Sequence, residues 1–256
     1  MELGTQKPNN GDAWNGFEWV SPDKYEEQRL RGLLFNNTPL PPLQAVPGAA
    51  LRDIDMAAVE ARVLAHMLAD PEHVVQALLA TVIGEDVTRG GLLETPQRAV
   101  KAWQHWTSGY RLNPADVLKV FEDGAEGCDE MVVVRDIPVY SHCEHHLAPI
   151  FGTATIGYLP DKRIVGLSKL VRLADVFARR LQVQERMTNQ IAEALMEHLK
   201  PLGCGVVINA RHMCMESRGV QCAGTSTITS ALRGVFKDDP RVRSEFLELA
   251  RETRRV

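Results

Sequence analysis

Two histidines, a cysteine and a glutamate follow one another in the stretch SHCEHHLAPIFG, residues 141–152. Cys143 and His146 are three residues apart in this short connection, so their side chains are close enough to bind one ion. A thiolate and an imidazole are ligand types that suit zinc. Because two protein ligands do not hold an ion, the stretch predicts only part of a metal site.

A third ligand is expected from the later stretch RHMC, in which His212 and Cys214 are two residues apart. If this stretch is a strand, both side chains project from the same face of the sheet, and Cys214 can complete the ligand set. Three protein ligands leave the fourth tetrahedral position for water, whose pKa a bound zinc lowers to about 7. His145 and His212 lie within two residues of a ligand and can transfer protons near neutral pH. Together these residues predict hydrolytic chemistry.

Spacing alone leaves two other interpretations of these residues open. The metal could be structural, held in a closed site that Cys222, Cys204 or His142 completes. Alternatively, the residues could bind no metal.

The segment GLSKLVRLAD predicts a helix start with the character of a phosphate site. Ser168 is expected at the N-cap, Lys169 in the first turn, and Arg172 three residues later on the same side. Free N–H groups and the helix dipole attract phosphate at such a position. The alternative is an ordinary solvated helix face. Further cations that could add to this charge are Arg218, Arg98 and Lys101.

An amide and a carboxylate stand together in QVQERM, as Gln184 and Glu185. Such a pair can bind the edge of a guanine, because the carboxylate accepts hydrogen bonds from the ring N–H and the exocyclic amine. As a bare pattern it is also typical of a helix surface.

Helices are predicted before the cysteine–histidine stretch. Apolar residues recur every three or four positions in 54–70 and again in 72–84. A third helix, 94–110, is expected to have Thr95 as N-cap and Pro96 at its first helical position. The first half of the body is therefore predicted to be helical.

Strands and helices are both predicted in the second half, which indicates an α+β domain with an antiparallel sheet and helices on one side. Residues rich in β-branched side chains form two expected strands that the cysteine–histidine stretch joins. The expected strands are 129–143, 147–160, 203–214 and 225–236, and the expected helices are 169–180, 185–199 and one from about 241.

Composition predicts a globular protein: the 256 residues are 45% hydrophobic and 24% charged. A net charge of −4 and a pI of about 6.1 argue against nucleic acid or an anionic membrane as the main partner. Without an apolar run of about 20 residues or a signal peptide, the protein is expected in the cytoplasm. The predicted division is a flexible arm at 1–50, a helical region at 51–125 and a catalytic domain at 126–256.

The order and spacing of these segments resemble the GTP cyclohydrolase I family, from about residue 54 to 253. Four segments carry the resemblance: LLETPQRAVKAW, SHCEHHLAPIFGTATIGYLP, VGLSKLVRLADVFARRLQVQERMTNQIAEAL and ARHMCMESRGVQ. Cys222 is a departure, a thiol that the resemblance does not lead us to expect.

The resemblance implies roles for individual residues. It makes Cys143, His146 and Cys214 the zinc ligands and His145 and His212 the acid/base histidines. It assigns guanine binding to Gln184 and Glu185. It assigns triphosphate binding to Ser168, Lys169, Arg172 and Arg218. It also implies that Arg98 and Lys101 reach the site from a neighbouring subunit.

The resemblance also implies an assembly and a reaction. The fold is the tunnelling fold, in which sheets from several subunits join into a barrel, and the assembly is a homodecamer of two pentamers with active sites at subunit interfaces. With GTP and water as substrates, zinc-activated water attacks C8 of the purine while His212 protonates the imidazole nitrogen. Formate leaves, and an Amadori rearrangement and ring closure, with His145 transferring protons, give 7,8-dihydroneopterin triphosphate. The rivals are a nitrile reductase of deazapurine synthesis and a non-catalytic zinc or nucleotide-binding module.

Overall fold

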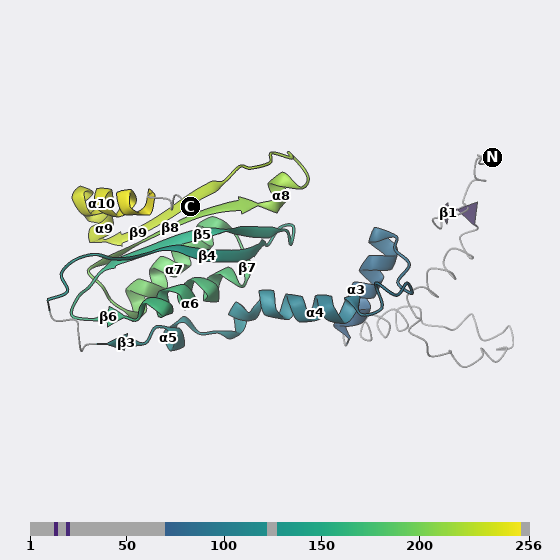
Figure 1. Ribbon diagram of the computed structural model, residues 1–256, viewed down its shortest axis with the longest axis horizontal. Coiled ribbons are helices and arrows are strands. Elements are labelled where there is room, and N and C mark those ends of the chain that lie inside the picture. Colours follow the sequence, from purple (N-terminus) through teal and green to yellow (C-terminus); the bar gives the residue numbers. More distant parts are fainter. Residues whose placement is uncertain (1–12, 15–18, 21–69, 122–126, 252–256) are drawn as a thin grey trace, which may run out of the picture. The chain divides into compact units, whose positions relative to one another are not determined.

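The computed structural model describes residues 13–14, 19–20, 70–121 and 127–251 (Figure 1). These residues fall into two compact units, which divide between Ala102 and Trp103. Among them, no helix combines the length and apolar composition that crossing a membrane requires.

Two short strands are described within the region predicted as an arm, 1–50. β1, Ala13–Trp14, pairs antiparallel with β2, Trp19–Val20. The rest of this region lies outside the described residues, and so does the predicted helix 54–70, whose last residue alone is described.

The predicted helix 72–84 is confirmed as two consecutive helical segments. α3, Pro71–Ala77, has Asp70 as its N-cap, and the Asp70 carboxylate accepts a backbone N–H of the first turn at 2.9 Å. A π-helix, Leu78–Ile83, follows and ends at Gly84, where a φ of 78° suits glycine.

The helix predicted at 94–110 is confirmed, with two differences at its ends. α4, Thr95–Trp106, begins at Thr95 itself, one residue earlier than an N-cap at that position would place it. A separate 3₁₀ turn, Ser108–Arg111, replaces the last predicted turn. α4 crosses the division between the two units.

A five-stranded sheet forms the centre of the C-terminal unit, with strand order β7-β4-β5-β8-β9. Its pairs are antiparallel, as predicted, except that β7 runs parallel to β4. The strands are β4 (Val132–Cys143), β5 (Pro149–Leu159), β7 (Leu181–Gln182), β8 (Gly203–His212) and β9 (Thr227–Gly234). A second, two-stranded sheet joins β3 (Val120–Phe121) to β6 (Ile164–Val165).

Helices cover both faces of this sheet, so the expectation of helices on one side alone is wrong (Figure 1). The face that carries most of the core packs against α6 and α7, and α9 and α10 lie over the other. The helices of this unit are α5 (Pro114–Val117), α6 (Leu167–Ala178), α7 (Gln184–His198), α8 (Met213–Glu216), α9 (Val235–Asp238) and α10 (Pro240–Arg251). The mixed α+β class itself is as predicted.

The main core follows from the spacing of apolar residues along α6. Its buried side chains recur at intervals of three and four residues, which places them on one face of the helix. Each fully buried leucine or isoleucine contributes about 1.5–3 kcal/mol. These side chains are Leu170, Leu173, Ala174 and Phe177, and the sheet opposes them with residues that include Ile137, Val139, Ile156 and Ile208.

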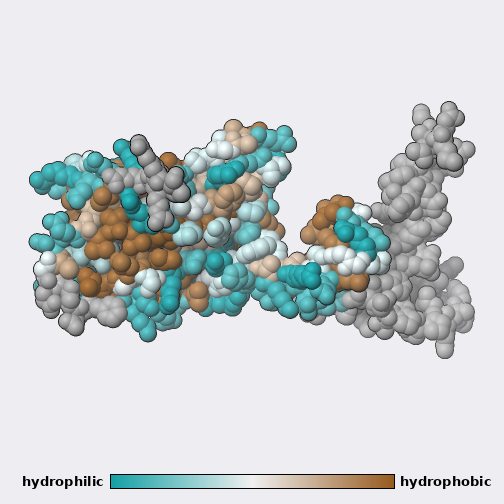
Figure 2. Space-filling view, in the orientation of Figure 1, coloured by the Kyte–Doolittle hydropathy of each residue, from teal (hydrophilic) through white to brown (hydrophobic). Residues whose placement is uncertain are grey.

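The other face of the sheet carries a glycine slot, which we define as Gly157 and Gly205, cross-strand partners on β5 and β8. Phe246 of α10 is fully buried against these glycines and meets Phe236 edge to face at 5.2 Å. A Cβ added at Gly205 would lie 2.4 Å from the Phe246 ring, so this packing requires glycine. α10 turns its hydrophilic side outward, and hydrophobic side chains gather below it (Figure 2).

Two predicted strands end earlier than expected. β8 stops at His212, which pairs with Ile150, because the next partner would be Pro149, which has no N–H to extend the ladder. β9 stops at Gly234, whose φ of 57° turns the chain into α9.

Candidate metal and catalytic site

The ligand loop, residues 143–148, joins β4 to β5 as a closed turn. The Cys143 N–H donates to the Ala148 carbonyl, and the Leu147 N–H donates to the Cys143 carbonyl, both at 2.8 Å. Leu147 has a φ of 54°, a left-handed conformation that is unusual for a bulky residue. This turn directs Cys143 and His146 toward the same side.

The third ligand comes from α8, the single helical turn that follows β8. The ligand atoms of Cys143, His146 and Cys214 all lie within 4.8 Å of one another, and Cys143 Sγ is 3.7 Å from His146 Nδ1. Ligand atoms of a tetrahedral zinc site lie roughly 3.3–3.8 Å apart, so small side-chain movements would bring this group to coordination distances. The group predicted from the sequence could hold a metal ion.

The prediction that Cys214 lies on a strand is wrong, but the prediction that it belongs to the ligand group agrees with the structure. Because β8 ends at His212, Cys214 reaches the group from a helical turn, and the shared strand face is not the reason for its position.

Burial is the main cause that raises the pKa of the Cys214 thiol, and the neighbouring Cys143 raises it further. The positive charge of Arg218 acts in the opposite direction. A bound cation would reverse this balance, because metal ligation holds cysteines as thiolates.

His145 lies on the open side of the ligand loop. Its side chain is 63% exposed, its Nδ1 is 3.8 Å from Cys143 Sγ, and its Nε2 is 3.8 Å from a Glu144 carboxylate oxygen. The imidazole is therefore accessible to a molecule bound at the metal group.

His212 is half-buried, and its Nε2 lies 2.7 Å from the side-chain oxygen of Gln184. Burial lowers the pKa of His212, while the charge of Glu185 raises it. The neutral imidazole is thus favoured near neutral pH, which suits a group that exchanges protons.

Gln184 determines which nitrogen of His212 carries the proton. Its side-chain nitrogen donates to the carbonyls of Ile208 and Thr227, at 3.1 and 2.9 Å. Since carbonyls only accept, the Gln184 oxygen must face His212, whose Nε2–H then donates. The neutral His212 ring consequently keeps its lone pair on Nδ1.

The two residues predicted to hold guanine are in different environments. The side chain of Gln184 is 1% exposed and is engaged with His212 and the strands. Glu185 is exposed and its carboxylate acts on His212. Of the pair, Glu185 is the one that solvent and a ligand can reach.

The predicted N-cap at Ser168 is wrong by two positions. Gly166 is the N-cap: its backbone is extended, and its carbonyl accepts the N–H of Lys169 at 2.7 Å. Ser168 therefore lies inside the first turn. It is exposed, as is Arg172, and Lys169 is partly exposed.

These three residues do not lie beside the ligand loop of the same chain. They begin α6, whose far end leads into β7, which pairs with the Cys143 end of β4 (Figure 1). Twelve helical residues span roughly 18 Å. By contrast, Arg218 lies near enough for its charge to act on Cys214.

The last two predicted cations belong to the N-terminal unit. Arg98 and Lys101 lie on α4, and both are exposed. Arg98 forms an ion pair with Glu94 one turn before it.

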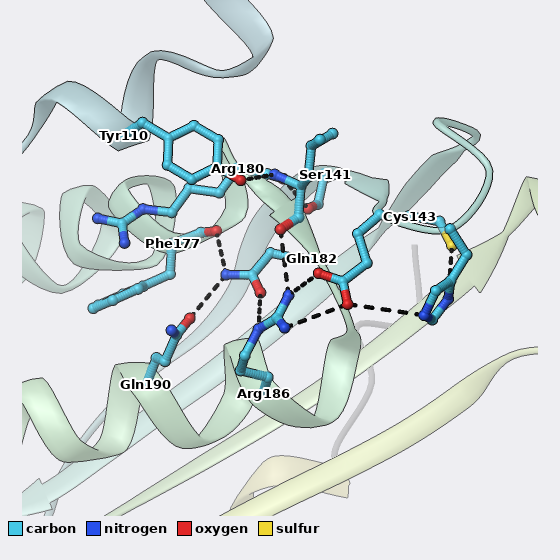
Figure 3. Close-up of polar contacts among 11 residues, drawn as sticks. Tyr110, Ser141, Cys143, Phe177, Arg180, Gln182, Arg186 and Gln190 are labelled. Carbon is cyan, nitrogen blue, oxygen red and sulfur yellow. Dashed lines mark hydrogen bonds and ion pairs between the residues drawn. The ribbon is translucent and has the colours of Figure 1, made fainter.

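Sequence reasoning missed two polar clusters near the metal group. Arg211 donates twice to Glu216, which also accepts the N–H of Gly224 at 3.1 Å, and this lowers the pKa of Glu216 to about 2. The second cluster joins Glu144 of the ligand loop to Arg186 of α7 (Figure 3). The glutamate beside Cys143 was a possible signal, but nothing local in the sequence identified its partner.

Comparisons with known proteins identify relatives along most of the chain. The family model of GTP cyclohydrolase I matches residues 71–251. The GTP cyclohydrolase 1 of Janthinobacterium sp. (strain Marseille) is 66% identical over 174 residues, which are 68% of this chain and 88% of that protein. That of Nitrosospira multiformis is 61% identical over 168 residues, 66% of this chain and 88% of that protein. That of Saccharomyces cerevisiae is 58% identical over 174 residues, 67% of this chain and 70% of that protein.

These matches establish the chain as an enzyme, and its class as a hydrolase. More particularly, the chain belongs to the GTP cyclohydrolase I family. The family resemblance read from the sequence is confirmed, and with it the GTP cyclohydrolase activity.

Proposed function

We propose that the protein opens the purine ring of GTP with the help of zinc, releases formate, and forms 7,8-dihydroneopterin triphosphate. The observation that supports this most directly is the group of Cys143, His146 and Cys214, with two imidazoles beside it. Two thiolates and an imidazole suit zinc, and zinc supplies water activation at neutral pH when it is bound.

His212 transfers a proton at Nδ1 in this mechanism. Its Nε2–H is held by Gln184, so Nδ1 is the nitrogen with the free lone pair: it takes up a proton from the attacking water and then passes that proton to the imidazole nitrogen of the purine. His145, on the exposed side of the ligand loop, transfers protons during the later rearrangement.

Glu185 binds the guanine by accepting from its N–H groups, and Gln184 contributes by orienting His212. The predicted guanine contact of Gln184 itself would require its side-chain amide to exchange present partners for the base.

A second copy of the chain completes the site. Ser168, Lys169 and Arg172 begin α6, about one helix length from the ligand loop of their own chain, so a neighbouring subunit supplies them to the triphosphate. Arg218 binds it from the chain that holds the metal, and Arg98 and Lys101 extend the cradle. The exposed edge strand β9, with Ile228 66% exposed, suits the joining of sheets into the barrel of a homodecamer with the tunnelling fold.

The proposed division is a catalytic domain at 126–256 that follows an arm and a helical region. We place the protein in the cytoplasm, where the free thiols of Cys143 and Cys214 stay reduced.

The experiment that tests the activity compares the purified protein with a Cys214→Ala variant on GTP. Zinc content, formate release and the fluorescence of the oxidised pterin are measured together. Zinc and both products from the wild type alone support the proposal. Cys222→Ala removes an exposed free thiol outside the group and serves as the matched control, which keeps full activity. Tight GTP binding without formate would instead favour the nucleotide-binding module.

Mixing two inactive variants tests the shared site. His146→Ala lacks a ligand and Lys169→Ala lacks part of the cradle, so each alone is inactive or nearly so. After joint unfolding and reassembly, roughly a quarter of the interfaces combine an intact ligand group with an intact cradle. Recovery of activity near that fraction supports a site built from two copies, and no recovery contradicts it.

A further inference from the structure

Arg186, labelled in Figure 3, donates hydrogen bonds from both terminal nitrogens of its guanidinium to the carboxylate of Glu144. Its Nη1 donates to one carboxylate oxygen at 3.3 Å, and its Nη2 donates to the other at a shorter distance. Arg186 is in the first turn of α7, and Glu144 stands between Cys143 and His145 in the ligand loop. A planar fork of this kind fixes the orientation of a carboxylate as well as its charge.

A buried amide holds the guanidinium from behind. Arg186 Nε donates to the side-chain oxygen of Gln182 at 3.2 Å, and Gln182 is 2% exposed. The Gln182 nitrogen donates to the Phe177 carbonyl at 3.0 Å and to Gln190 at 2.9 Å. Because the Phe177 carbonyl only accepts, it fixes the orientation of the Gln182 amide, and the oxygen must face Arg186.

Gln182 also holds the backbone of the ligand loop. The Glu144 N–H donates to the Gln182 carbonyl at 3.1 Å. Glu144 is therefore attached at two points, through its backbone directly and through its side chain by way of Arg186.

The Glu144 carboxylate needs this restraint because it lies next to the metal ligands in the sequence. Glu144 directly follows Cys143 and precedes His146 by two residues, and a carboxylate oxygen is itself a common zinc ligand. A carboxylate released from Arg186 could rotate toward the metal group and occupy the position that water must take.

We propose that Arg186 is a positioning residue that holds Glu144 on the α7 side of the loop and so keeps the fourth metal position open to water. The inference rests on the proposed zinc-dependent hydrolysis. The side-chain hydrogen bonds of Arg186 go to Glu144, Gln182 and Leu181, and none goes to a residue of the metal group.

Arg186→Gln tests the proposal, because it removes the charged fork and keeps a polar side chain. Mutation of a residue that supports a metal site from outside its ligands typically costs about 10–100-fold in activity or affinity. We expect kcat to fall by that factor while KM for GTP stays within about twofold, since the substrate contacts are unchanged. Arg186→Lys, which keeps the charge without the fork, should lose less. Arg241→Gln removes an exposed ion-pairing arginine of α10 and is the matched control, with wild-type kcat.

The double variant Arg186→Gln/Glu144→Gln separates positioning from general support. If Arg186 acts through Glu144, adding Arg186→Gln to Glu144→Gln changes kcat by less than about twofold. An equal loss in both backgrounds would overturn the proposal.

The visible spectrum of the cobalt(II)-loaded protein gives a readout that does not depend on turnover. Arg186→Gln should shift the cobalt bands as Glu144 joins the ligands, and the double variant should restore the wild-type spectrum. Identical spectra in wild type and Arg186→Gln would overturn the inference. Failure of the wild type to release formate would contradict the proposed hydrolysis. The cobalt spectra would still decide whether Arg186 controls the position of Glu144.

Discussion

The two ends of strands β4, β5 and β8 are built by different means. At one end, the ligand loop and α8 are fixed by directional hydrogen bonds, and their functional side chains remain at least partly exposed, except for the buried Cys143. At the other, the glycine slot admits the Phe246 ring, and this packing, together with a hydrogen bond from Arg135 of β4 to the Leu249 carbonyl at 3.2 Å, holds α10 to the sheet. The difference teaches that chemistry and stability can be altered separately on one set of strands.

The largest expected effect is the loss of activity in His146→Ala. Removing one of three ligands should lower formate release by about three orders of magnitude or more. Because His146 is exposed, the midpoint of thermal unfolding of the metal-free protein should stay within a few degrees of the wild type. Calorimetry of the chelator-treated proteins measures this midpoint. A large fall in the midpoint would contradict the view that catalysis and stability depend on different ends of the strands.

Phe246→Ala should show the reverse pattern. Deleting a fully buried phenylalanine costs about 3–5 kcal/mol of unfolding free energy. Denaturant titration measures this loss, and kcat per folded molecule should remain near wild type. Gly205→Ala would place a methyl group against the Phe246 ring, and this overpacking should cost about 1–3 kcal/mol of unfolding free energy. A fall in kcat without a loss of stability would contradict this account of the slot.

Gln184→Leu should affect both catalysis and stability, because Gln184 hydrogen-bonds both to His212 and to backbone carbonyls of β8 and β9. We expect kcat to fall about 10–100-fold through the misplaced imidazole, with KM changed far less. The unpaired carbonyls of Ile208 and Thr227 should cost about 1–3 kcal/mol of unfolding free energy. Steady-state kinetics and denaturant titration on the same preparation measure the two effects. A rise in KM alone would show that Gln184 binds guanine directly instead.

Tyr158→Phe is the smallest expected change. The Tyr158 hydroxyl accepts the buried N–H of Val165 at 3.2 Å, so its removal should cost about 1–2 kcal/mol of unfolding free energy. Activity should be unchanged. Urea titration detects the loss, and a stability equal to wild type would show that another group satisfies the N–H.

The sequence predicted those elements and groups that depend on residues close together along the chain. The helix start in GLSKLVRLAD, the β-branched runs of β4 and β5, and the Cys143 and His146 pair are local patterns, and each predicted its element or group. The end of β8 was mispredicted because it depends on Pro149, a partner on another strand that local propensity does not reveal.

Contacts between distant residues could not be predicted. Glu144 and Arg186 are 42 residues apart, and nothing in QVQERM indicated which carboxylate its arginine would bind. The glycine slot depends on the register that opposes Gly157 to Gly205, and register is set by the assembled sheet. Family resemblance supplied roles for individual residues, but not these supporting contacts.

The left-handed backbone at Leu147 has a consequence for the rate at which the site takes up its ion. A non-glycine residue in this conformation costs about 1–2 kcal/mol, and the two hydrogen bonds that close the turn involve no ligand atom. The loop thus holds its shape through backbone hydrogen bonds and through its ties to Gln182 and Arg186, none of which uses a ligand side chain. Metal loading should therefore follow the rate at which ions arrive, with a linear dependence on their concentration and no slow folding phase.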